Sequence, residues 1–122
     1  MEVIFIKRYV VEFGYGVDLH GQDVNKAAQK AVKDAISHSC LCGLEEILGV
    51  NLDEVIVEAI VAVSRPEEID EEGIKAVLPI GQKYVKAVKG GLRVPGIKEP
   101  QFGDTEDDSI EVAVACVTVS IK

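Results

Sequence analysis

The sequence has no tryptophan, one methionine, and only three phenylalanines and three tyrosines among its 122 residues. Aliphatic side chains must therefore fill the core. Hydrophobic residues make up 48% of the chain, too many for a disordered protein and enough for a chain of this length to bury one core. We therefore expect residues 1–122 to form a single domain.

Long apolar runs and an excess of basic charge are also missing. No run approaches the roughly 18–20 apolar residues that a membrane-spanning helix needs. The first residues place an acid before the apolar stretch and bases after it, the reverse of a secretory signal. With a net charge of −8 and dispersed basic residues, the chain lacks the basic face of nucleic-acid binders and the attraction to anionic membranes. We expect neither kind of partner.

Cysteine is scarce and odd in number. Cys40 and Cys42 are too close in sequence for an ordinary disulfide, and Cys116 lies inside an apolar segment. Free thiols are typical of a reducing compartment, so we expect a cytoplasmic protein.

Hydrophobic periodicity predicts the secondary structure. Residues 2–13 alternate as a strand does, and a glycine-rich turn follows them. From Val24 the apolar residues recur at helical spacing, with Asp23 as N-cap and an end near Ser37. A second helix is predicted after Asp70. The further predictions are a helical turn at 44–48, strands at 54–63, 83–89 and 110–121, and a long loop at 90–108.

This βαβαββ order predicts an α/β fold of the α+β two-layer type. Right-handed crossovers would place both helices on one face of a mixed four-stranded sheet. Strands 54–63 and 110–121 are apolar on both faces, unlike a sheet with one solvated face. We therefore expect copies of the chain to cover the other face in a homo-oligomer.

Polar residues follow the first two parallel strands at one edge of the predicted sheet, where open α/β sheets tend to bind ligands. His20 would carry a proton, Asp18 would orient the His20 side chain, and Arg65 would bind an anion. The whole predicted cluster is Asp18, His20, Gln22, Arg65, Gly90 and Gly91. The simpler interpretation is that Arg65 pairs with a surface acid and the glycines only turn the chain.

Two other sequence features, a partial glycine motif and a long loop, do not identify a site. Gly14 and Gly16 begin a dinucleotide fingerprint, but Leu19 occupies its third glycine position, so we reject a nucleotide site. The loop 93–108 is long enough for a lid or a subunit arm, and otherwise a mobile connection.

The opposite edge carries a second group, consisting of Ser37, His38, Ser39, Cys40, Cys42 and Lys83. Cys40 and Cys42 with His38 could bind a soft metal, but their spacing is unlike that of zinc sites, and we assign no metal. Ser37 or Ser39 could act as a nucleophile with Lys83 as its base. The leading interpretation is a helix C-terminus where His38 faces the dipole and the serines bond free carbonyls. The sequence assigns no cofactor.

The segments GVDLHGQD (16–23), AISHS (35–39), LPIG (78–81) and GGLRVPG (90–96) carry a resemblance. Through them, over nearly its whole length, the chain resembles the Lin-type conserved hypothetical family, which is named for a Listeria locus. This resemblance implies no activity. In architecture the chain is similar to reactive-imine deaminases and chorismate mutases, whose trimers place active sites between subunits. That similarity favours a trimer.

Three functions stay open. The first is a small-molecule enzyme or binding protein with sites between subunits, acting on a small anionic or carbonyl or amide substrate through Asp18, His20 and Arg65. The second is a non-enzymatic assembly or partner-binding module. The third is a Ser–Lys hydrolase of cyclic amides, which such βαβ units resemble.

Overall fold

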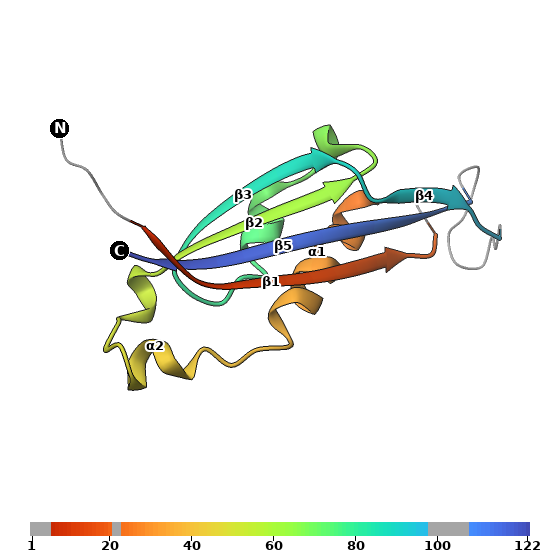
Figure 1. Ribbon diagram of the computed structural model, residues 1–122. Helices are drawn as coiled ribbons and strands as arrows, with labels where there is room; N and C mark the ends of the chain where they lie inside the picture. Colours follow the sequence, from red (N-terminus) through yellow and green to blue (C-terminus); the bar gives the residue numbers. More distant parts are fainter. Residues whose placement is uncertain (1–5, 21–22, 98–107) are drawn as a thin grey trace.

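The computed structural model describes residues 6–20, 23–97 and 108–122. Figure 1 traces its strands and helices in chain order. The elements are β1 (Lys7–Asp18), α1 (Val24–Ile36), α2 (Cys42–Glu46), β2 (Ile56–Val63), α3 (Glu71–Lys75), β3 (Gln82–Lys89), β4 (Leu92–Pro95) and β5 (Ser109–Ile121), with 3-10 turns at Leu52–Glu54 and Pro66–Glu68.

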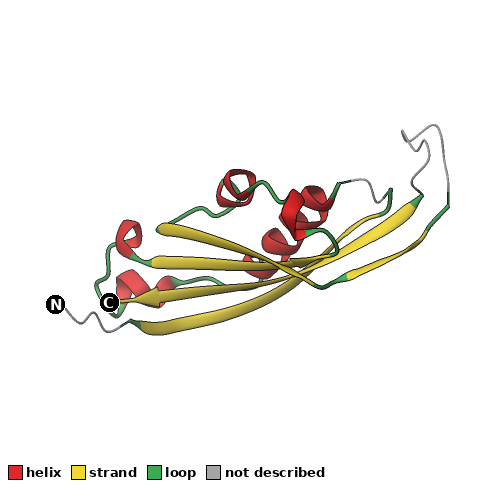
Figure 2. Ribbon diagram, turned by 90° about the horizontal axis from the view of Figure 1, so that it is seen from above, coloured by secondary structure: helices red, strands yellow, loops and turns green. Residues whose placement is uncertain are grey.

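The strands form one mixed sheet in the order β1-β5-β2-β3. β5 runs antiparallel to both β1 and β2, and β2 runs parallel to β3, so β1, β2 and β3 all point the same way. Figure 2 shows the helices gathered on one side of this sheet. The predicted two-layer fold with both helices on one face is confirmed. No helix among the described residues is long and apolar enough to cross a membrane.

The prediction of four strands was wrong, because residues inside the expected loop 90–108 form β4. Gly91 adopts a φ of 67°, and a Cβ there would lie 2.2 Å from the carbonyl oxygen of Val112. This turn carries the chain from β3 past the end of β2 to pair with β5. Residues 98–107, most of the predicted lid or arm, lie outside the described residues.

The first strand also runs further than predicted. Gly14 and Gly16 lie within β1 rather than in a turn. A Cβ on Gly14 would be 2.3 Å from the amide nitrogen of Ala35, and a Cβ on Gly16 would be 2.3 Å from the carbonyl oxygen of Ala27. The two glycines therefore let α1 pack closely on β1.

The first helix begins as predicted. The Asp23 carboxylate accepts a hydrogen bond from the backbone N–H of Asn25 at 2.8 Å, and the helix ends at Ile36. Its buried face is made of alanines and valines that pack on β1, β5 and β2.

The second helix is shorter and is held differently. Asp70 is the N-cap residue of α3, but its carboxylate makes no capping hydrogen bond. Instead, the Asn25 side chain donates to the carbonyl of Glu68 at 2.9 Å and accepts from the backbone N–H of Asp70 at 2.7 Å. A side chain of α1 thus fixes the start of α3.

The sheet has one covered and one uncovered face. The residues of β2 and of β5 up to Val119 that face the helices are buried, and the alternate residues are not, except for Ser120 at the end of β5. We call the surface opposite the helices the open face. In register across β1, β5, β2 and β3, it is made of the rows Val11–Thr118–Glu58–Tyr84, Phe13–Cys116–Ile60–Lys86 and Tyr15–Val114–Ala62–Val88.

Candidate functional site

A buried carboxylate lies at the end of the sheet where β1, β2 and β3 finish. Glu111, on β5, is 0% exposed. Its carboxylate accepts hydrogen bonds from the hydroxyl of Ser64 and, at 3.4 Å, from the backbone N–H of Ser64. Nη1 of Arg93 lies 3.5 Å from Glu111 Oε1. Because the charge is buried, it needs these partners.

The register places one of the predicted residues beside this carboxylate. Asp18 pairs with Glu111 across β1 and β5, and Arg93 pairs with Glu111 across β4 and β5. His20 follows Asp18 by two residues, and Arg65 follows Ser64 directly. Gln22 lies outside the described residues. We call Asp18, Ser64, Arg65, Arg93 and Glu111 the strand-end cluster.

Part of the simpler interpretation of this edge has structural support. Arg65 forms an ion pair with Glu68 at 3.2 Å, as a surface arginine would. The backbone N–H of Gly90 donates to the carbonyl of Val63 at 2.9 Å. The positive φ of Gly91 explains why a glycine stands at that position. The substrate-binding role of Arg65, Gly90 and Gly91 stays a prediction.

Sequence reasoning missed Ser64, Arg93 and Glu111. Glu111 had a signal, because it is the only charged residue between 109 and 121 and stands in an apolar strand. A lone charge at an inward position of such a strand indicates a buried partner. The charged partner, Arg93, comes from β4, which was not predicted.

At the end of α1, His38 and Ser37 form local contacts. His38 Nε2 lies 3.0 Å from Asp34 Oδ1, and the hydroxyl of Ser37 donates to the carbonyl of Asp34 at 2.7 Å. The backbone N–H of Tyr15 donates to Asp34 Oδ2 at 3.0 Å. This bond, more than the hydrogen bond and charge of His38, holds the pKa of Asp34 below its usual 3.8, although partial burial opposes it.

Neither the Ser–Lys pair nor the metal site considered for this end of the helix is formed by the described residues. In the described part of the chain no hydrogen bond joins Lys83 to Ser37 or Ser39, and no three His, Cys, Asp or Glu residues are grouped to hold a metal. Cys40 and Cys42 are free, exposed thiols. The Ser–Lys and metal hypotheses gain no support from these positions.

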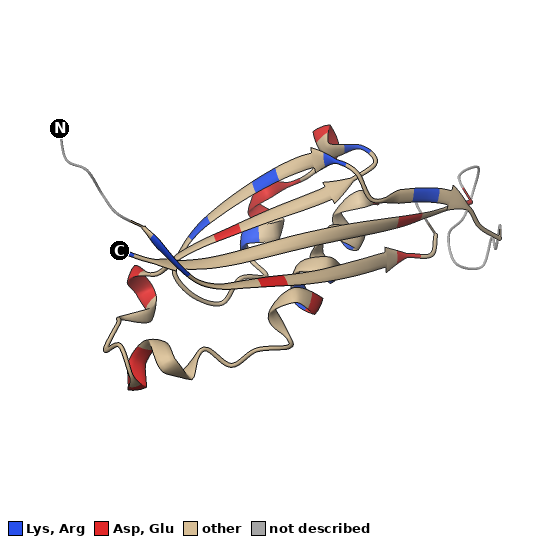
Figure 3. Cartoon of the chain, in the orientation of Figure 1, with Lys and Arg blue, Asp and Glu red and all other residues tan. Residues whose placement is uncertain are grey.

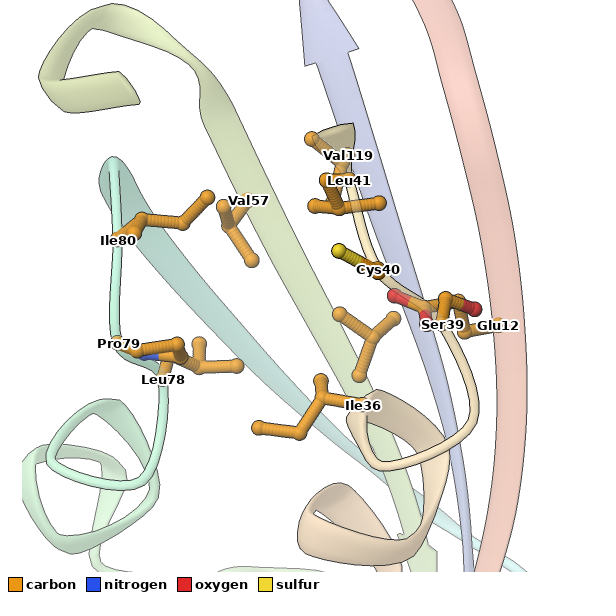
Figure 4. A pocket seen from close by; sticks show the side chains of 11 residues that line it. Glu12, Ile36, Ser39, Cys40, Leu41, Val57, Leu78, Pro79, Ile80 and Val119 are labelled. Atoms are coloured by element: carbon orange, nitrogen blue, oxygen red, sulfur yellow. The ribbon is translucent and has the colours of Figure 1, made fainter. Parts of the chain in front are cut away.

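A pocket of about 300 Å³ opens beyond the C-terminus of α1. Its floor is the inward face of β5 and β2, and its walls are the segments 39–41 and 78–80. Figure 4 shows Glu12 beside Ser39 on one side of the pocket, across from Pro79 and Ile80. Glu12 was also missed, although an acid at an inward position of an alternating strand could have indicated it.

Comparison with known proteins gives two matches. The family model described as a conserved hypothetical protein, Lin0512_fam, matches residues 8–119. The crystal structure of an FtsZ-like protein of unknown function from Nostoc punctiforme is 42% identical and has a TM-score of 0.88. The match covers 96% of this chain and 97% of that one. A search of curated proteins gives no match.

Proposed function

Because the chain belongs to the Lin0512 family of conserved hypothetical proteins, whose description gives no activity, we propose its function from its own surfaces. It functions as a homo-oligomer that binds a small molecule, and its copies associate through the open face. The observation that carries this proposal is the apolar character of a sheet face that none of the described helices covers.

Large side chains are exposed on this face. Phe13, Tyr15 and Tyr84 are 67%, 65% and 53% exposed. Val11, Leu92, Val94 and Val114 are also exposed, and the two β4 residues pair with Val112 and Ile110, which are on the same side of β5 as Val114. At ~150–200 Å² for a fully exposed side chain of this size, the seven expose on the order of 600 Å² of apolar surface. Two such faces would bury about 1,200 Å², more than the roughly 1,000 Å² expected of a specific interface.

The distribution of charge favours a second copy as the occupant. The chain carries 21 acidic residues and a net charge of −8, so most of its surface repels another copy. The three rows of the open face contain one acid, Glu58, and one base, Lys86, and thus no net charge. Figure 3 shows the strands as mostly uncharged ribbon. Two copies therefore meet without repulsion at this face.

The test compares two aspartate substitutions at exposed apolar residues. Phe13→Asp places a charge on the open face, and Ile47→Asp, at a residue that is 82% exposed beside α2, is the matched control. In sedimentation velocity over a dilution series, the wild type and Ile47→Asp should sediment as the same oligomer and Phe13→Asp as a folded monomer. A monomeric wild type, or a Phe13→Asp variant that assembles like the wild type, would refute the proposal.

The number of copies follows from the same measurement. A single face that packs against itself makes a two-fold dimer. The architectural similarity noted in the sequence favours a trimer instead, in which each copy would present two different surfaces. A cytoplasmic location is part of the proposal and is supported by the free, exposed thiols of Cys40 and Cys42.

A second candidate function, chemistry or anion binding at the strand-end cluster, is supported by the buried Glu111 carboxylate and its register partner Asp18. In this function His20 carries the proton, Asp18 orients the His20 side chain and Arg65 binds an anion. His20→Asn should remove binding of a small dicarboxylate such as malonate, measured by calorimetry, and leave the melting temperature unchanged. A large fall in melting temperature would instead make His20 a structural residue.

A further inference from the structure

The pocket beyond α1 exists because the helix stops there. α1 lies closely on Gly14 and Gly16 and ends at Ile36, which borders the pocket. The next inward-facing residue along β1 is Glu12, so its side chain enters the space that the helix leaves uncovered. This space is on the helix side of the sheet and does not depend on self-association.

The Glu12 carboxylate is buried without a partner. Glu12 is 7% exposed, and its Oε2 atom makes no hydrogen bond with any described residue. Among the described residues that line the pocket, none is a lysine, an arginine or a histidine. A buried carboxylate is costly unless it is paired and hydrogen-bonded, so the geometry calls for a donor from outside the chain.

The surrounding field favours a positive charge. The C-terminal carbonyls of a helix carry partial negative charge, and the last residue of α1 is at the pocket. The inward-facing lysine closest in register to the floor of the pocket is Lys83 of β3, which pairs with Val57 of β2. Lys83 is three strands away from β1, about 14 Å between backbones at the usual strand spacing, and it is not among the residues that line the pocket with Glu12.

The walls determine the rest of the ligand. Of the eleven lining residues, only Glu12 and Ser39 carry polar oxygen groups in their side chains. The others are aliphatic apart from Cys40, whose thiol is at the wall nearest Ser39. A volume of about 300 Å³ is at the small end of ligand sites. The complementary molecule is therefore compact and apolar, with one positively charged donor group.

We propose that this pocket binds a small organic ammonium ion, with Glu12 as its counter-ion and the aliphatic walls around its hydrocarbon body. The ammonium donates to Oε2 of Glu12, and the hydroxyl of Ser39 on the same wall is the second polar contact. The ligand is a monocation with an apolar body, because nothing in the lining would solvate a second charge.

The test uses three probes of one shape and different charge. Cyclohexylammonium, cyclohexanol and cyclohexanecarboxylate are titrated into the full chain and followed by calorimetry and by amide NMR shifts. The ammonium should bind about tenfold or more tightly than the alcohol, as expected for a charged contact in a desolvated site, and shift Ile36, Leu41 and Ile80. The carboxylate should not bind.

Two variants complete the test. Glu12→Gln should remove the preference for the ammonium over the alcohol, and Glu71→Gln, which removes an exposed acid from the first turn of α3, should keep it. Equal binding of ammonium and alcohol to the wild type would overturn the proposal, as would a preference that survives Glu12→Gln. Absence of ammonium binding at this pocket in the wild type would overturn it even if the Glu12 variant did not fold.

Discussion

Glu111 is a buried charge with one partner directly after β2, Ser64, and another in β4, Arg93. Replacement by Gln keeps the size of the side chain and removes the charged acceptor of Ser64 and Arg93. Glu111→Gln should lower the free energy of unfolding by about 1–3 kcal/mol, because hydrogen bonds to a charged group are lost in a buried site. Urea unfolding measures this, and an unchanged midpoint would show that the carboxylate contributes nothing to stability.

Asp34 gives a pH-dependent contribution of definite sign. Its pKa is lowered in the folded chain, first by the backbone N–H of Tyr15 and also by His38. A lowered folded pKa stabilises the protein above the unfolded value, and this stability is lost as pH falls through the folded pKa. Asp34→Asn should therefore be less stable than the wild type at pH 7, and the difference should shrink below pH 3.8. Urea unfolding of both proteins at pH 7 and below pH 3.8 measures this. A difference in the free energy of unfolding that is the same at the two pH values would contradict the prediction.

Residues whose roles are local could be predicted from the sequence, and residues with distant partners could not. Asp23 caps the helix that it begins, and the spacing alone indicated this. Glu12 and Glu111 each depend on what other strands and loops bring to them. Asp18 and Arg65 were expected at one edge because parallel strands end together, which the directions of β1 and β2 bear out.

At the scale of elements, the contact between α1 and β1 depends on the absence of two side chains. A Cβ at Gly14 would meet helix backbone, which cannot move aside as a side chain can. Gly14→Ala should destabilise the protein by about 2 kcal/mol or more, through overpacking. The control is Gly73→Ala in α3, where a Cβ meets only side-chain atoms at 3.1 Å or more.

The control should be neutral or stabilising, because alanine forms helix better than glycine by up to about 1 kcal/mol. Thermal unfolding of both variants compares the sites. Equal melting temperatures would show that α1 can move away from β1 at little cost. The pocket beyond α1 depends on this packing, since it begins where the glycines end.

Periodicity predicted the long elements well and the short ones poorly. α1 and β5 carry their pattern over 13 residues each, and both were found close to the expected bounds. β4 has only four residues between a glycine turn and the segment that follows Pro95, too few to show a period. Its pairing with β5 is a tertiary contact, which local sequence does not encode.

At the scale of the whole molecule, one layer of helices covers one face of the sheet and leaves the other apolar. The lack of polar alternation in 54–63 and 110–121 already indicated two apolar faces, because burial on both sides leaves a continuous hydrophobic run. The sequence could not show which face the helices cover, since that depends on the crossover and on the order of the strands. The structure assigns the open face to residues such as Phe13, Tyr15 and Tyr84.

Self-association through the open face is the central claim, and native mass spectrometry of gently purified protein tests it most directly. The measurement weighs both the assembly and any small molecule that stays bound to it. We predict an integer multiple of the chain mass for the wild type, and a single chain for Phe13→Asp under the same conditions. A wild type that is detected only as a monomer without ligand at every concentration would contradict the claim. The open face would then require a different protein to cover it.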